Sequence, residues 1–141
     1  MHSFLFHKKN VAHATALGAR VHSQTFYLCK RRKHMTTTTI PSNFTLLFTK
    51  EILSNIKVFK DEENMRYQID LHGLSRKQAY FIITAVIQLT REAFTLDLIH
   101  GFNHGTVLKS MIFENIQNPR ILNKYCNPWN PGETFIELTA A

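Results

Sequence analysis

Two His-Gly pairs, each at the end of a short apolar run, are the residues of this sequence best suited to acid–base chemistry. The first pair is the end of Asp70-Leu71-His72-Gly73, and the second is the end of Leu98-Ile99-His100-Gly101. Asp70 and His72 are two residues apart, so their side chains point to the same face of an extended strand. A carboxylate beside an imidazole fixes the ring tautomer and stabilises the protonated ring near neutral pH. The spacing therefore predicts a general acid or base at His72, oriented by Asp70.

The second His-Gly pair begins a turn with features of an anion-binding site. The turn contains two glycines, which let a backbone approach a ligand closely, and it leads into a predicted helix. The N-terminus of a helix offers unpaired N–H groups and a positive dipole end to a phosphate. We therefore predict phosphate or nucleic-acid contacts from seven residues: His100, Gly101, Asn103, His104, Gly105, Thr106 and Lys109.

The same residues also allow simpler interpretations. A histidine at the end of a strand can be a hydrogen-bonded turn residue, and the glycines can serve only to give the backbone a positive φ. Four side chains, Asp70, His72, His100 and His104, could instead bind zinc, although no ligand spacing requires it. The identity of any metal stays open at this point.

Alternating strand and helix patterns place both His-Gly pairs. Ser75 followed by Gln78 has the spacing of a capping box, and apolar residues recur at helical spacing up to about Ala93. A second helix begins at Thr106 and is stopped by Asn118-Pro119. Four strands are predicted, at residues 65–71, 95–100, 121–126 and 134–138.

The predicted order β-α-β-α-β-β indicates a two-layer α/β (α+β) sandwich. Its first two strands are expected to be parallel, with a right-handed crossover between them. Ligands of such sheets bind at the carboxyl ends of the strands. Asp70, His72 and the turn that begins at His100 should therefore lie at one edge of the sheet.

The composition of the 141 residues limits the function classes. Hydrophobic residues make up 44% of the chain, and no apolar run approaches the length of a membrane span, so we expect no membrane partner. Two cysteines exclude a disulfide framework and a cysteine-built zinc site. The formal net charge of +7 comes entirely from residues 1–34, because residues 35–141 carry ten basic and ten acidic residues. The basic character therefore does not belong to the predicted domain.

The chain divides into three parts by composition. Residues 1–34 are interpreted as a basic segment that is disordered or precedes the true start at Met35, as a basic arm, or as an organellar targeting segment. Residues 35–64 are expected to be a connector with one short element, a helix or an edge strand within 47–60. Residues 65–138 are the predicted domain. We expect a cytoplasmic protein, with organellar targeting as the alternative.

The two motifs together resemble the Smr (small MutS-related) domain family, in particular its small stand-alone bacterial members. That family has an L-D-x-H-G signature, which reads Ile69-Asp70-Leu71-His72-Gly73 here, and an H-G-x-G-x-G-type turn, which reads His100 to Thr106. Asn130-Pro131-Gly132-Glu133-Thr134 is similar to the family's turn before the last strand. One departure is that Phe102-Asn103-His104 replaces the family's middle glycine.

The resemblance implies a fold similar to the C-terminal domain of bacterial translation initiation factor 3. It also implies nucleic-acid binding and an endonuclease that nicks DNA or cleaves RNA, in some members on messenger RNA at stalled ribosomes. Asp70 and His72 would be the catalytic pair. On RNA, the 2′-hydroxyl could serve as nucleophile without a metal, whereas a metal route would use Asp70 with a divalent ion such as Mg²⁺.

Two other functions remain open from the sequence. The domain could be a non-catalytic module that grips a phosphate of a nucleic acid or at a ribosome, or a protein-interaction domain that pairs through its sheet edge. The zero net charge of residues 35–141 is unusual for a free-standing nucleic-acid binder, which is normally basic.

Overall fold

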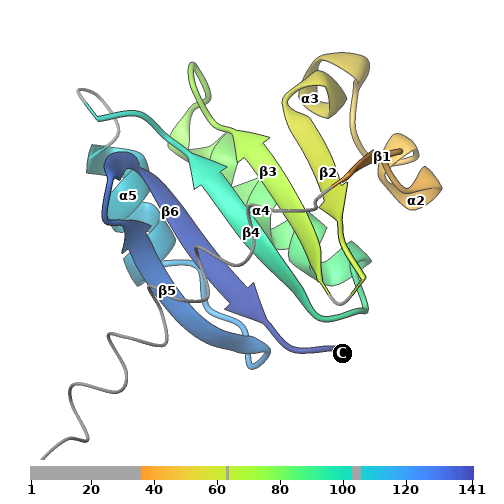
Figure 1. Cartoon of the computed structure of the whole chain (residues 1–141). Helices are drawn as coiled ribbons and strands as arrows, with labels where there is room; N and C mark the ends of the chain where they lie inside the picture. The colour runs from red at the N-terminus through yellow and green to blue at the C-terminus, as the bar shows by residue number, and fades with distance from the viewer. Residues whose placement is uncertain (1–35, 63, 103–105) are drawn as a thin grey trace, which may run out of the picture. The chain divides into compact units, whose positions relative to one another are not determined.

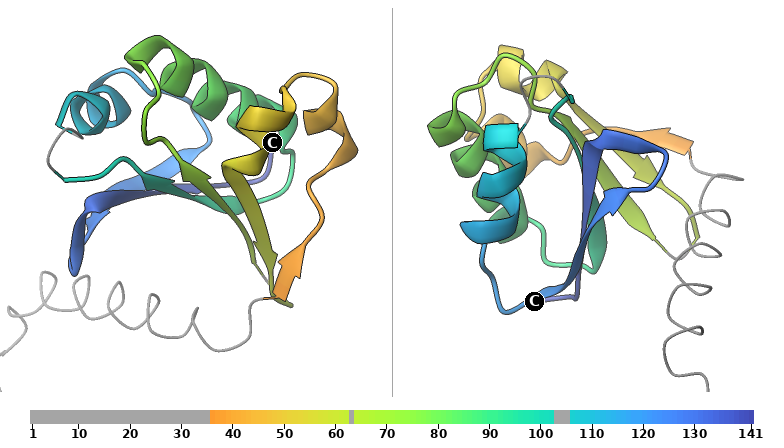
Figure 2. Two further views of the ribbon diagram at one scale, coloured as in Figure 1. Left: turned by 90° about the horizontal axis from the view of Figure 1, so that it is seen from above. Right: turned by 90° about the vertical axis from the view of Figure 1, so that its left-hand side faces the viewer.

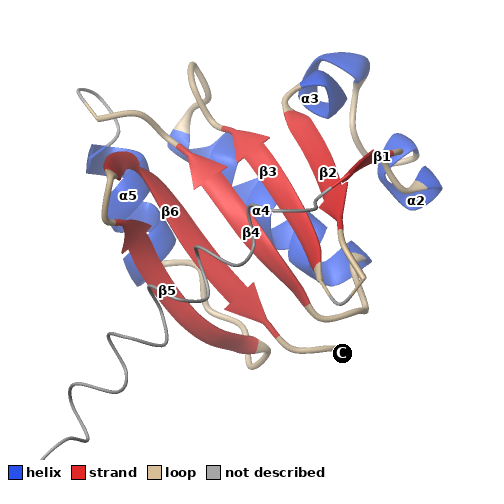
Figure 3. Cartoon of the chain, viewed as in Figure 1, coloured by secondary structure: helices blue, strands red, loops and turns tan. Residues whose placement is uncertain are grey.

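The computed structural model of the chain describes residues 36–62, 64–102 and 106–141 as a mixed α/β domain (Figure 1). One six-stranded sheet carries its helices on a single face (Figures 2 and 3). The described helices are α2 (Ser42–Thr45), α3 (Lys50–Ser54), α4 (Arg76–Leu89) and α5 (Thr106–Glu114). The strands are β1 (Thr36–Thr38), β2 (Ile56–Lys60), β3 (Met65–Asp70), β4 (Phe94–Ile99), β5 (Ile121–Asn127) and β6 (Asn130–Leu138).

The strand order β1-β2-β3-β4-β6-β5 brings the two His-Gly pairs to one edge. β3 and β4 are parallel, with Asp70 paired to Ile99, so their carboxyl ends lie at the same level. The other neighbouring strands are antiparallel. The predicted two-layer α/β class and the parallel pairing are therefore confirmed.

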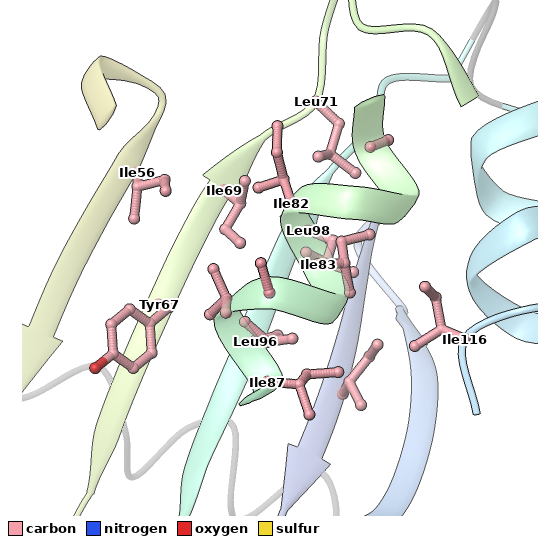
Figure 4. Close-up of a cluster of buried hydrophobic side chains, with 14 of the residues drawn as sticks. Ile56, Tyr67, Ile69, Leu71, Ile82, Ile83, Ile87, Leu96, Leu98 and Ile116 are labelled. Atoms are coloured by element: carbon pink, nitrogen blue, oxygen red, sulfur yellow. The ribbon is translucent and has the colours of Figure 1, made fainter. Parts of the chain in front are cut away.

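The helix face of the sheet holds the core (Figure 4). Alternate residues of β3 and β4 point into it, among them Tyr67, Ile69, Leu96 and Leu98, which are 0–1% exposed. α4 contributes Ile82, Ile83 and Ile87. Each such side chain contributes roughly 1.5–3 kcal/mol when buried. This packing fixes α4 against the two strands whose ends carry the histidines.

Residues 36–60 differ from the expected connector, because they form β1, α2, α3 and β2. The ambiguity within 47–60 is resolved as one helix followed by one strand. Phe44, Phe48, Ile56 and Val58 are buried in the core cluster, so this segment completes the domain. Its apolar residues are divided among several short elements, so no single helical or strand period runs through the segment. The domain thus begins well before residue 65.

Two predicted boundaries also move. α4 ends at Leu89, four residues before Ala93, because Thr90 adopts an extended conformation with ψ 118°. β6 begins at Asn130 rather than at 134, since the hairpin turn between β5 and β6 is very short. None of the described helices is long and apolar enough to cross a membrane.

Arg120, just before β5, ties the end of α4 to the end of the chain. Its guanidinium donates to the carbonyls of Ile87 (2.8 Å), Thr90 (2.7 Å) and Glu92 (2.9 Å), and Nε donates to that of Thr139 (3.0 Å). The guanidinium also lies 5.7 Å from the centroid of the Phe94 ring. These bonds satisfy carbonyls that the end of a helix leaves without partners.

Replacing Arg120 with Met is expected to lower the free energy of unfolding by about 2–4 kcal/mol, because several charge-assisted hydrogen bonds are lost together. Urea unfolding measures the change. Arg91→Met, at an exposed position in the loop between α4 and β4, is the control and should stay within about 0.5 kcal/mol of the parent. Equal stabilities of the two variants would contradict the assigned role.

Candidate active site

Asp70 and His72 form a hydrogen-bonded pair at the carboxyl end of β3. Asp70 Oδ1 lies 2.6 Å from Nδ1 of the His72 ring, and it also accepts a bond from the His72 backbone N–H at 2.9 Å. The two bonds fix both side chains within a three-residue stretch. Because Asp70 accepts only, the proton lies on Nδ1 and Nε2 is left free in the neutral ring. The His72 side chain is 58% exposed, so a substrate can reach it.

Gly101 brings the second strand end against this pair. Its φ is +77°, and a Cβ at this position would lie 2.7 Å from His72 Nε2. The ring therefore rests on the bare backbone of the turn after β4. A side chain at position 101 would occupy the space of the imidazole. The motif therefore requires glycine here for steric reasons as well as for the positive φ.

Gly132 supports the turn from β6. Its carbonyl accepts from the backbone N–H groups of His100 (2.9 Å) and Gly101 (3.0 Å). A Cβ on Gly132 would lie 2.9 Å from the Gly101 carbonyl carbon. Two glycines from two loops thus meet within van der Waals contact beside His72.

His100 holds the turn rather than facing solvent. It is 4% exposed, and its Nδ1 donates to the Gly101 carbonyl at 3.0 Å while Nε2 accepts from the Thr134 hydroxyl at 2.9 Å. Burial lowers the pKa of His100, and the nearby charges of Lys109 and His72 act in the same direction. The ring is therefore neutral at pH 7. We assign His100 a positioning role in place of the phosphate contact predicted from the sequence.

Positive charge gathers around the pair from both helices. Lys109 on α5 is half-buried and close enough to act on the pKa of His100. Arg76 and Lys77 are exposed in the first turn of α4, where Ser75 forms the predicted capping box with Gln78. Thr106 is the exposed first residue of α5. The predicted contacts at Asn103, His104 and Gly105 lie outside the described residues.

Asp97 is a buried carboxyl near the site that the sequence interpretation missed. It is 1% exposed on the sheet face opposite the helices, and it accepts a bond from Gln68 Nε2 at 2.8 Å. Burial, together with the neighbouring carboxyl of Glu133 on β6, raises the pKa of Asp97 to about 7. The available signal was an acid inside the apolar run Phe94-Thr95-Leu96-Asp97-Leu98-Ile99.

A metal centre finds no support among the residues that the structure describes. No three His, Cys, Asp or Glu side chains gather there as metal ligands would. His100 uses both ring nitrogens within the protein, which removes it from the zinc set suggested by the sequence. His104 lies outside the described part of the chain. Asp70 keeps its exposed oxygen for a divalent ion.

Gly101→Ala should disable the site while leaving the fold intact. The new Cβ displaces the His72 ring, and a displacement of about 1 Å can lower a rate by roughly 100-fold. Gly73→Ala is the matched control, because Gly73 has a φ of +75° but nothing within 4 Å of a Cβ. Both variants should lose about 1–2 kcal/mol of stability from backbone strain. Only Gly101→Ala should lose activity, measured as described below, and equal activities would contradict the steric argument.

Comparisons with protein-family models, with curated proteins and with solved structures give no match to this chain.

Proposed function

We propose that the chain is an Smr-like, nucleic-acid-binding endonuclease that cleaves a phosphodiester backbone at the Asp70–His72 pair. The observation that carries the proposal is the short bond between Asp70 Oδ1 and His72 Nδ1. It leaves Nε2 free at an exposed edge, beside the turn that begins at His100. Lys109, Arg76 and Lys77 add positive charge at the same edge, which favours an anionic substrate.

On RNA, the pair supplies the base of a transesterification. Nε2 of neutral His72 takes the proton of a 2′-hydroxyl, whose oxygen attacks the adjacent phosphorus as the bond to the 5′-oxygen breaks. The leaving oxygen receives a proton from water, the His72 imidazolium returns its proton to the solvent, and the products are a 2′,3′-cyclic phosphate and a 5′-hydroxyl. Asp70 stabilises the imidazolium through Nδ1–H. On DNA, water must be the nucleophile, and a divalent ion at Asp70 would lower the pKa of that water.

A non-catalytic phosphate-binding module is the second candidate. Its support is that the N–H groups of His100 and Gly101 are already bonded to Gly132. They are therefore not available to stabilise charge on a transition-state phosphate. This candidate uses the same charged edge and expects binding without cleavage.

The test is cleavage of end-labelled single-stranded RNA and of supercoiled plasmid by the full chain, with EDTA or with Mg²⁺. RNA cleavage in EDTA with a 2′,3′-cyclic phosphate end supports the base mechanism. Plasmid nicking only with Mg²⁺ supports the metal route. The His72→Ala chain, purified identically, controls for contaminating nuclease. Salt-sensitive binding without cleavage would replace the nuclease proposal with the binding module.

A further inference from the structure

Two large aromatic side chains are exposed near the candidate active site. Phe102, directly after the Gly101 turn, is 68% exposed, and Trp129, in the β5–β6 turn, is 64% exposed. Within the described residues, neither ring stacks on another aromatic ring or on a cation. The other exposed aromatics, Tyr80 and Phe81, lie on α4. Exposed apolar surface next to a site commonly marks a surface that binds a ligand.

The two loops that carry these rings are joined at Gly132. A Cβ on Gly132 would lie 3.1 Å from the Phe102 backbone nitrogen, so Phe102 follows directly from the contact between the loops. Trp129 is three residues before Gly132, which limits their separation to about 10 Å along the chain. Figure 1 shows the β5–β6 turn and the chain that leaves β4 at the same end of the sheet. Phe102 and Trp129 are therefore carried by the two loops whose contact lies beside His72.

The β5–β6 turn is held in shape by its own side chains. The backbone N–H of Trp129 donates to Asn127 Oδ1 at 3.0 Å, and the backbone N–H of Gly132 donates to Asn130 Oδ1 at 3.1 Å. Asn127 Nδ2 donates to Glu133, which ties the turn to β6. An aromatic ring on a braced turn loses little freedom when a planar ligand stacks on it, so stacking is favoured there.

From these observations we infer that the site takes single-stranded nucleic acid, with unpaired bases stacked on Phe102 and Trp129 while the backbone passes His72. This inference rests on the proposed function and names its substrate class. Both faces of a base in a duplex are covered by its neighbours, whereas an unpaired base offers its face to an aromatic ring.

Base stacking also accounts for nucleic-acid binding by a domain that has no net charge. Residues 35–141 carry no net charge, so phosphate attraction alone gives weak binding. Base–aromatic stacking adds affinity that does not depend on salt, at about 1–3 kcal/mol per base. A neutral domain with a small basic edge and two stacking platforms can therefore hold a short single strand.

Tryptophan fluorescence of the full chain tests the inference directly, because Trp129 is the only tryptophan in the sequence. The chain carries His72→Ala so that no strand is cut during titration. We expect emission to be quenched by a ten-nucleotide single strand. The same strand in a duplex, and an abasic strand of equal length, should not quench it. Quenching equal with the abasic strand would overturn stacking at Trp129.

Affinity measured by anisotropy of a labelled single strand tests both rings. Phe102→Ala and Trp129→Ala should each weaken binding roughly 5- to 150-fold, with the salt dependence of binding unchanged. Leu122→Ala is the matched control, because Leu122 is 69% exposed at the far end of β5 from the turn and should bind like the parent. Unchanged affinity in both aromatic variants would overturn the inference.

The outcome separates this inference from the proposed function. Base-dependent quenching without cleavage by the parent chain would retain the single-strand site and reject the nuclease. Cleavage that proceeds with full rate in Phe102→Ala and Trp129→Ala would retain the nuclease and reject the stacking platforms.

Discussion

Replacing His72 with alanine is expected to lower the cleavage rate by roughly 10²- to 10⁴-fold, which is the usual contribution of a positioned general base. The reason is geometric, since Nε2 of this ring is the free nitrogen of a neutral imidazole beside the Gly101 turn. The side chain is exposed, so its removal leaves no cavity in the core. The measurement is single-turnover cleavage of labelled RNA, with urea unfolding to verify an unchanged fold.

Asp70→Asn separates orientation from basicity. The asparagine is nearly isosteric, but its amide can donate to Nδ1 and so favour the wrong ring tautomer. We expect a loss close to that of His72→Ala, and the double variant should be no slower than the worse single one, because the two residues act as a unit. Additive losses would show that Asp70 acts separately from His72, for example by holding a metal ion.

Asp97→Asn is expected to stabilise the domain above neutral pH, by about 2–4 kcal/mol. Asp97 is 1% exposed, and its Oδ1 accepts no hydrogen bond, whereas Oδ2 accepts from Gln68. The Glu133 carboxyl faces Asp97 closely enough to share a hydrogen bond, which needs a proton on one of the two acids. An asparagine supplies a permanent N–H donor to Glu133 and keeps an oxygen for Gln68.

The pH dependence follows from the raised pKa of Asp97. The pKa is 3.8 in the unfolded chain and about 7 in the folded one, so the folded state holds an extra proton between these values. The contribution of Asp97 to the free energy of unfolding is full below pH 4. It is lost as the pH rises through 7, at up to about 1.4 kcal/mol per pH unit. Arg66, whose Nε is 4.0 Å from Asp97 Oδ2, opposes the shift but does not cancel it.

Urea unfolding of the parent and of Asp97→Asn at pH 5 and pH 8 measures this contribution of Asp97 to the free energy of unfolding. From pH 5 to pH 8, the free energy of unfolding of the parent should fall relative to that of Asp97→Asn. Glu92→Gln, which alters an exposed carboxyl, serves as control and should track the parent. Parallel pH profiles of the parent and Asp97→Asn would mean that Asp97 is ionised in the folded protein.

The parts of the site that the sequence predicted are the parts that are local. Asp70 and His72 are two residues apart, and a strand alone places them together. The capping box at Ser75 is likewise contained in four residues. To predict that His100 lies opposite them, one must also infer that β3 and β4 are parallel, which the strand–helix–strand order implies.

The missed features depend on contacts between distant residues. Gly132 lies 31 positions after Gly101, and no spacing rule predicts that its carbonyl holds the turn. The buried state of His100 depends on Thr134 in β6, and that of Asp97 on the antiparallel β4–β6 pairing. Residues 36–60 were expected to be a connector because their apolar residues are divided among short elements with no single period, and their burial shows only when the sheet is assembled.

The position of β6 within the sheet sets the order in which the site can be completed during synthesis. Among the strands of this sheet, β6 is the last to leave the ribosome, yet it lies between β4 and β5. The Asp70–His72 pair needs only its own strand and can form on the nascent chain. The turn at His100 must wait for Gly132 and Thr134, some thirty residues later. A chain with this topology withholds its finished site until translation has passed β6.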